Sequence, residues 1–149
     1  MGMSIEANLS GDGCRLVVRI KGYAQPNITD GIDANFLMGE VEVRVGMSAP
    51  FYVTMPAKVH TEDIRRFHDQ LQRLDHELSG QAILDNVDSD FQATITLEAG
   101  KGTLAGIVRE WATELRFKDV PIDQTYVHAA LHEFGQLAAA FPVRGSAWG

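Results

Sequence analysis

The sequence predicts an α+β fold, with a predominantly antiparallel sheet of about seven to nine strands and two amphipathic helices packed on one face. Three observations predict it. Apolar and polar residues alternate along several short segments, two longer segments have the three-to-four spacing of a helical stripe, and glycine-rich turns separate neighbouring strands. A chain of 149 residues that is 45% hydrophobic can form one core, so residues 1–149 are expected to be a single domain.

The first half is expected to consist mainly of strands. Residues 4–9 lead into a turn at Gly11 and Gly13, which can adopt the positive φ of a tight hairpin. Residues 14–20 and 40–45 alternate apolar and charged side chains, so each strand should bury one face. Pro50 and Pro56 are expected to delimit a further short strand at 50–55.

A helix is predicted near residues 62–78. Thr61 is expected to be its N-cap, with Glu62 and Asp63 in the first turn, where the helix dipole favours acidic side chains. The Ser79-Gly80 pair should end it. The apolar stripe of this helix predicts that Phe67, Leu71 and Leu74 are core residues.

The second half repeats this plan, although the two halves differ too much in sequence to predict a repeat. Strands are expected from Ile83, over 91–98, over 104–111 and over 115–117. Pro121 should break the sheet, and Asp123 should cap a second helix near 124–140. Phe134 and Leu137 lie on the apolar face of that helix and are expected in the core.

Composition narrows the function classes. The net charge of −7 disfavours nonspecific nucleic-acid binding, which requires a basic surface. No apolar run approaches the ~20 residues of a membrane span, and no signal peptide is recognisable, so a cytoplasmic protein is expected. The single cysteine, Cys14, begins an apolar strand and is expected to be a buried thiol. The sequence indicates no cofactor.

No complete catalytic or metal-binding motif is present. Gly100-Lys101-Gly102-Thr103 lacks the spacing of a phosphate loop and is expected to be a hairpin turn. His128 and His132 are four residues apart on the second helix, but the chain lacks the zincin pattern and an identifiable third ligand. Both are expected on a solvated helix face, as are His68 and His76. His60 precedes the first helix and has no evident partner.

Acidic residues at two places are the candidates for binding a partner. Asp85, Asp88 and Asp90 are expected at a bend between two strands, where they could form an acidic knob. Glu40 and Glu42 belong to the polar side of a strand. A broad, mixed-charge sheet face should lie away from the helices and could dock a protein. Its expected members are Arg15, Arg19, Glu40, Glu42, Arg44, Thr94, Thr96, Glu114, Arg116 and Lys118.

Five short motifs, in this order and spacing, resemble the WapI-type immunity proteins of bacterial polymorphic toxin systems. They are Asp33-Ala34-Asn35-Phe36-Leu37, Leu78-Ser79-Gly80-Gln81-Ala82, Glu114-Leu115-Arg116-Phe117, Asp123-Gln124-Thr125-Tyr126 and Phe141-Pro142-Val143-Arg144-Gly145. The resemblance covers most of the chain from about residue 14. It implies a small cytoplasmic protein that neutralises a cognate toxin domain, often a nuclease, without catalysis. No toxin-contacting residue carries over. Asp33 and Asn35 are instead expected to bond the backbone, and Tyr126 to anchor the last helix.

Three functions therefore compete. The leading hypothesis is a toxin-neutralising binding protein, with homodimer formation left open. The second is a small-molecule binding module with a pocket between helices and sheet, lined by Tyr23, Trp111 and Tyr126. The third is a hydrolase that uses the histidine pair or the three aspartates of the bend. The sequence favours the first, with Glu40, Glu42, Asp85, Asp88 and Asp90 as candidate partner-binding residues.

Overall fold

The computed structural model describes residues 4–86 and 88–146 and has eight strands and two long helices in those ranges. Four strands and a helix follow one another twice along the chain. In the first half they are β1 (Ile5–Gly11), β2 (Cys14–Tyr23), β3 (Phe36–Val45), β4 (Phe51–His60) and α1 (Thr61–Glu77), with a short 3₁₀ helix, Ile32–Asn35, before β3. In the second half they are β5 (Gly80–Asp85), β6 (Phe91–Glu98), β7 (Lys101–Glu110), β8 (Thr113–Asp123) and α2 (Gln124–Ala140).

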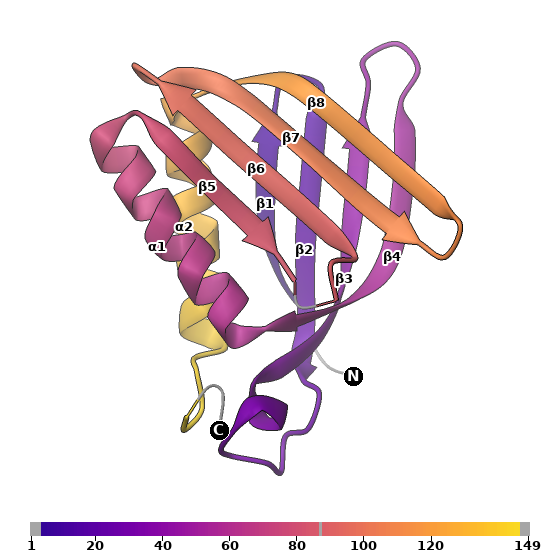
Figure 1. Cartoon of the computed structure of the whole chain (residues 1–149), viewed down its shortest axis with the longest axis vertical. Coiled ribbons are helices and arrows are strands. Elements are labelled where there is room, and N and C mark those ends of the chain that lie inside the picture. The colour runs from indigo at the N-terminus through magenta and orange to yellow at the C-terminus, as the bar shows by residue number, and fades with distance from the viewer. Residues whose placement is uncertain (1–3, 87, 147–149) are drawn as a thin grey trace.

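The strands form two antiparallel sheets in sequence order, β1-β2-β3-β4 and β5-β6-β7-β8. The α+β class, the antiparallel pairing and the strand number are therefore confirmed. The division into two sheets is an addition to the prediction. It arises because α1 separates β4 from β5, so each half builds its own four-stranded meander. Figure 1 shows the second sheet in front of the first, with both helices together on one side.

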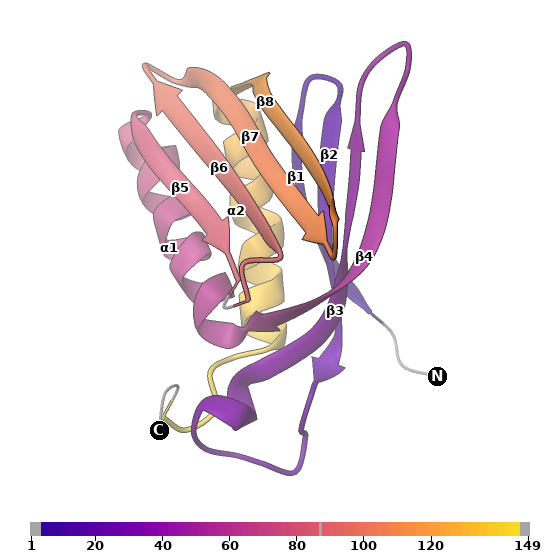
Figure 2. The same ribbon diagram turned by 45° about the vertical axis from the view of Figure 1, so that its right-hand side comes forward.

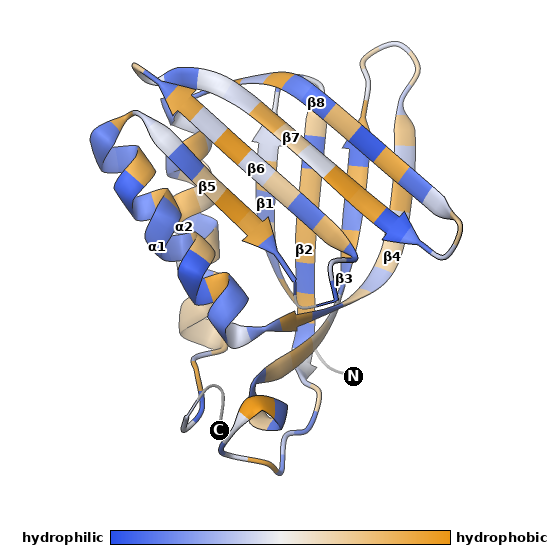
Figure 3. Ribbon diagram, in the orientation of Figure 1, coloured by the Kyte–Doolittle hydropathy of each residue, from blue (hydrophilic) through white to orange (hydrophobic). Residues whose placement is uncertain are grey.

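One continuous core joins all the elements. The inward faces of both sheets and the apolar stripes of both helices contribute to it, and all five predicted core side chains are buried, namely Phe67, Leu71, Leu74, Phe134 and Leu137. Figure 2 shows the two sheets as separate layers, with α1 beside β5 of the second sheet and α2 beside β1 of the first. The strands alternate polar and apolar residues, as Figure 3 shows, so one face of each sheet turns away from this core.

Side chains at the ends of the fourth strands start both helices. Asp123 accepts hydrogen bonds from the backbone N–H groups of Thr125 and Tyr126, which confirms the predicted N-cap of α2. For α1 the prediction was wrong by one residue. The N-cap is the buried His60, whose Nδ1 accepts from the Glu62 N–H at 3.1 Å, while Asp63 accepts from the His60 N–H at 3.0 Å. A histidine can replace the usual short polar cap because its neutral ring nitrogen is an acceptor.

Each helix lies along the first strand of the other half's sheet, α1 along β5 and α2 along β1. Gln70 of α1 accepts a hydrogen bond from the Ile83 N–H of β5 at 2.6 Å. Glu133 of α2 occupies the same position in its helix and accepts from the Asn8 N–H of β1 at 3.0 Å. Edge N–H groups that lack a strand partner are thereby satisfied by helix side chains.

Two prolines were wrongly expected to end strands. Pro56 lies within β4 and Pro121 within β8, and β4 and β8 are the last strands of their sheets. A proline is tolerated in an edge strand where its missing N–H would face away from the neighbouring strand. The Pro121 carbonyl accepts a hydrogen bond from the Asp12 N–H, outside its own sheet.

The C-terminal segment, residues 141–146, is fastened to the short 3₁₀ helix before β3 through Arg144 of the last motif. The buried Asn35 donates to the carbonyls of Gly31 and Arg144 and accepts from the Arg144 N–H. The Arg144 guanidinium donates to the Ala34 carbonyl and lies 3.7 Å from the centre of the Tyr23 ring. Backbone bonding by Asn35 is thus confirmed, and the Phe-Pro-Val-Arg-Gly motif has a structural role.

Candidate functional site

The polar face of the first sheet is organised around Arg19 of β2. Its Nε donates to Glu6 at 2.8 Å and its Nη1 to Glu40 at 2.6 Å, while Nη2 lies 3.8 Å from Glu42. The hydrogen bonds to Glu6 and Glu40 raise the pKa of Arg19 above its usual range. Three carboxylates share one guanidinium, so this cluster is an acidic surface held in one geometry.

Aromatic and hydroxyl groups extend this surface onto β4. The Tyr52 hydroxyl donates to Glu42 at 3.0 Å, and the Thr54 hydroxyl donates to the Tyr52 oxygen at 2.9 Å. The Arg44 guanidinium lies 5.1 Å from the centre of the Tyr52 ring. We call the set Arg19, Glu40, Glu42, Arg44, Tyr52 and Thr54, together with Glu6 on the neighbouring β1, the β2–β4 face.

The three aspartates lie at the bend between β5 and β6, as predicted. Asn86, which is buried, shapes the bend by accepting a hydrogen bond from the Asp90 N–H at 2.9 Å and donating to the Lys58 carbonyl of β4 at 3.1 Å. Asp85 accepts from the Gln92 side chain at 3.4 Å. The candidate acids therefore occupy two places, the β2–β4 face and this bend, and Asn86 ties the bend to β4.

The predicted histidine pair does not form a ligand set. His128 is 73% exposed and its Nδ1 lies 3.1 Å from a carboxylate oxygen of Asp75, whereas His132 lies 3.3 Å from Gln136. No group of three potential metal ligands occurs in the described ranges. The exposed positions of His128, His132 and His76 are confirmed, but His68 is half-buried, because it packs toward Gly135 of the other helix.

The Gly100-Lys101 segment is a hairpin turn between β6 and β7, with Gly100 at φ 81°. The prediction of a turn is confirmed, and no helix N-terminus follows it to bind a phosphate.

The aromatic side chains proposed to line a small-molecule pocket do not converge. Trp111 is 97% exposed at the β7–β8 turn. The Tyr23 hydroxyl donates to the Pro142 carbonyl, and the Tyr126 hydroxyl donates to Asp12, which ties the start of α2 to the β1–β2 turn. The first of these contacts lies just after the C-terminal end of α2 and the second at its N-terminal end, so the 17-residue helix separates them. The prediction of a shared pocket was wrong, whereas Tyr126 does anchor the last helix.

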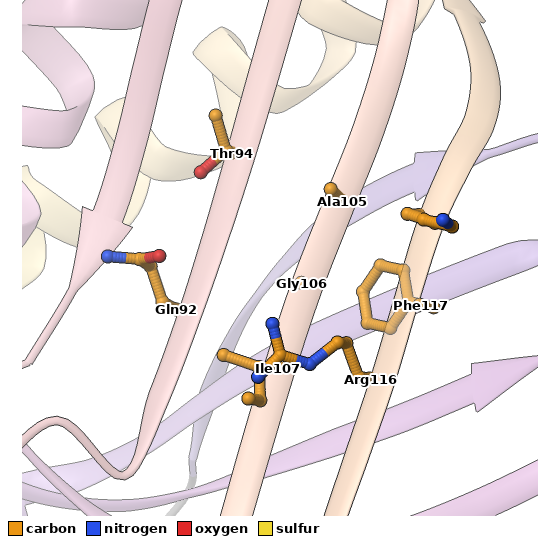
Figure 4. A pocket seen from close by; sticks show the side chains of 8 residues that line it. Gln92, Thr94, Ala105, Gly106, Ile107, Arg116 and Phe117 are labelled. Carbon is orange, nitrogen blue, oxygen red and sulfur yellow. The ribbon is translucent and has the colours of Figure 1, made fainter.

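The polar face of the second sheet carries a shallow hollow of about 180 Å³. Figure 4 shows Gln92 and Thr94 on one side of it and Arg116 on the other, with the Phe117 ring beside Gly106. A Cβ atom on Gly106 would collide with that ring. The hollow opens to solvent and offers no enclosed binding volume of the kind that small-molecule sites usually have.

Burial raises the pKa of the Cys14 thiol from 9.0 to about 11. We therefore expect iodoacetamide at pH 8 to leave the native thiol unmodified and to modify it rapidly in urea, because only the thiolate reacts. Because this pKa is raised, the contribution of the protonated thiol to stability is fully present below pH 9 and is lost as the pH rises toward 11. Mass spectrometry of the alkylated protein measures the extent of iodoacetamide labelling. Equal labelling rates in buffer and urea would show that the thiol is not protected.

Comparison with known families decides the identity of the chain. The model of the "Immunity protein WapI-like family" matches residues 6–142. The chain belongs to this family. No curated protein matches this WapI-like chain. The crystal structures of "trypanosoma bruciei MRP1/MRP2" are similar over 95% of this chain and 88% of that chain, with 10% sequence identity and a TM-score of 0.49. At these values the likeness supports no functional inference.

The β2–β4 face contains residues that the sequence could not single out. Arg19 and Tyr52 connect the candidate acids Glu40 and Glu42, but the strand pairing that brings them together is non-local. The period-two pattern placed Arg19 on the correct side of its strand. It gave no information on which residue lies opposite.

Neither helix of the described WapI-like chain is long and apolar enough to span a membrane.

Proposed function

We propose that this WapI-like protein neutralises a cognate toxin domain in the cytoplasm by occupying it, without chemistry of its own. Membership of the immunity protein family over residues 6–142 is the observation that carries the proposal. The surface chemistry agrees with it, because the described residues offer broad polar sheet faces and shallow hollows suited to a protein partner.

The β2–β4 face and the β5–β6 bend are the proposed contact region. The β2–β4 face carries three carboxylates against the two guanidinium groups of Arg19 and Arg44, and the bend adds Asp85, Asp88 and Asp90, so acids are in excess. A basic partner such as a nuclease would be attracted by these charges, since opposite potentials accelerate encounter. An acidic surface seated over a nuclease site would also repel the phosphates of its substrate.

Copurification tests the function directly. A toxin domain encoded by a neighbouring gene should copurify with the protein in a stable complex and lose its activity there. A toxin that stays active with an excess of the folded protein would contradict the proposal, as would a purified protein that consumes a substrate of the toxin unaided.

Charge reversal at Glu40, Glu42, Asp85, Asp88 and Asp90 should slow association with the toxin about tenfold or more at low salt. The effect should shrink as salt rises, because screening shortens the range of exposed charges. Stopped-flow association rates at several salt concentrations measure it. Replacing Glu40 and Glu42 by glutamine keeps hydrogen-bonding groups near Arg19 and guards against a loss of folding.

Two controls accompany this prediction. Reversal of the exposed acids Glu77 and Glu98 changes the net charge without touching the proposed region, so it should slow association much less. The double substitution His128→Ala/His132→Ala should leave neutralisation intact. If reversal of the Glu77/Glu98 pair slowed association as much as reversal of the Glu40/Glu42 pair, the proposal that the β2–β4 face contacts the toxin would be contradicted.

A further inference from the structure

Three of the four outer edges of the two sheets are blocked. Glu133 of α2 bonds the β1 edge and Gln70 of α1 bonds the β5 edge. The β8 edge carries Glu114, Arg116, Lys118 and Asp119, and a register shift interrupts its pairing with β7. Asp119 itself has a φ of 58°. Charges and irregular backbone of this kind prevent another strand from pairing with an edge.

The β4 edge has none of these protections over residues 51–55. Ten consecutive residue pairs join β3 and β4 without a register shift. The segment Phe51-Tyr52-Val53-Thr54-Met55 is uncharged, and its first four residues are of types that favour strands. Phe51 is 66% exposed and Tyr52 is 54% exposed. β4 makes its main contacts with β3 and the start of α1, and Figures 1 and 2 both show it as the outermost strand of its sheet.

Pro56 reveals which backbone groups face this free edge. In an antiparallel ladder, alternate residues direct their N–H and C=O groups to opposite sides. Pro56 has no N–H to give to β3, so its pair with Glu40 is a non-hydrogen-bonded one and its backbone faces outward. Lys58, two residues later, should have its backbone groups on the same outward side. This is observed, because its carbonyl accepts a hydrogen bond from Asn86 outside the sheet. Tyr52 and Thr54 follow the same alternation and therefore present two N–H and two C=O groups to the edge.

This edge is complementary to itself. If two β4 segments pair antiparallel about Val53, Tyr52 lies opposite Thr54 of the other copy and Phe51 opposite Met55. All four N–H and all four C=O groups of the two edges are then paired. Pro50 and Pro56 also fall opposite each other, so the paired segment ends at a proline on both strands. No like charges meet within it.

We propose that the β4 edge of this protein pairs with the β4 edge of a second copy, forming a two-fold dimer in which the first sheets join into one continuous sheet. The inference does not depend on the toxin, since it rests on backbone geometry alone. Four hydrogen bonds and a few apolar contacts form a small interface, so the dimer is weak and depends on concentration. The dimer leaves the outward side of the β2–β4 face open.

Sedimentation equilibrium of Thr54→Pro and Thr54→Val tests the edge. Thr54→Pro removes an N–H that the monomer does not use, as Pro56 does naturally, and deletes two of the four intermolecular hydrogen bonds. It should raise the dimer dissociation constant about tenfold or more. Thr54→Val keeps the N–H and should leave the dissociation constant within about threefold of the natural protein. A natural protein that is monomeric up to millimolar concentration overturns the proposal, as does dimerisation that Thr54→Pro leaves unchanged.

A cysteine crosslink tests the register independently. Val53 lies opposite its own copy in a non-hydrogen-bonded pair, where Cα atoms are about 4.5 Å apart and a disulfide can form. Val53→Cys should therefore give a disulfide-linked dimer on mild oxidation. Tyr52→Cys places the cysteine opposite Thr54, so it should crosslink slowly or not at all. Faster crosslinking of Tyr52→Cys than of Val53→Cys would overturn the two-fold pairing about Val53.

Discussion

Replacing Leu71 by alanine is expected to lower the free energy of unfolding by about 2 to 5 kcal/mol. Leu71 is fully buried on α1, in the core that both sheets share. The substitution removes apolar contacts and leaves a cavity that the packed surroundings fill only in part. Urea denaturation followed by circular dichroism measures the loss as a lower midpoint at an unchanged slope.

The effect of Leu71→Ala should be large because both helices enclose the site. The rings of Phe67 on α1 and Phe134 on α2 meet edge to face, with their centres 4.9 Å apart, and limit how far the helices can close over a cavity. Arg73→Ala is the matched control, since Arg73 is exposed on the same helix. Equal losses for the two variants would contradict the assignment of the apolar stripe.

The parts of this fold that follow local rules could be predicted from the sequence. Period-two alternation identified the strands, and the stripe with Phe67, Leu71 and Leu74 identified α1 to within a residue. Aspartate is a common cap, so Asp123 was recognisable, whereas His60 was not. Pro56 and Pro121 were misread because a proline ends a central strand but not an edge strand, and the position of a strand within a sheet is not a local property.

The candidate site depends on contacts between residues far apart in sequence, and the sequence predicted correspondingly less of it. The strand pattern placed Glu40 and Glu42 on the polar side of β3. Their connection to Arg19 and Tyr52 requires the register of three strands. The same limit explains why Asn35 was expected only to bond the nearby backbone, while its partner Arg144 lies 109 residues away.

That distant contact makes Asn35→Ala the second substitution with a large expected effect, a loss of about 3 kcal/mol in the free energy of unfolding. Asn35 is fully buried and accepts hydrogen bonds from the Thr61 hydroxyl at 2.8 Å and the Arg144 N–H at 2.7 Å. It also donates to the carbonyls of Gly31 and Arg144, each at 2.9 Å. Alanine would leave these groups without their partner, and a buried polar group without a partner costs about 1 to 3 kcal/mol.

Hydrogen exchange distinguishes this mechanism from a general loss of packing. Because Asn35 holds both the C-terminal segment and the start of α1, Asn35→Ala should speed amide exchange at residues 141–146 and around Thr61 before it affects the sheets. The exposed neighbour Asp33 provides the control, and Asp33→Ala should change the unfolding free energy by less than about 0.5 kcal/mol. If exchange at 141–146 stayed at its natural rate in Asn35→Ala, the segment would be held by contacts other than this asparagine. The Arg144 guanidinium would then be the next group to test, since it bonds the Ala34 carbonyl and covers the Tyr23 ring independently of the Asn35 side chain.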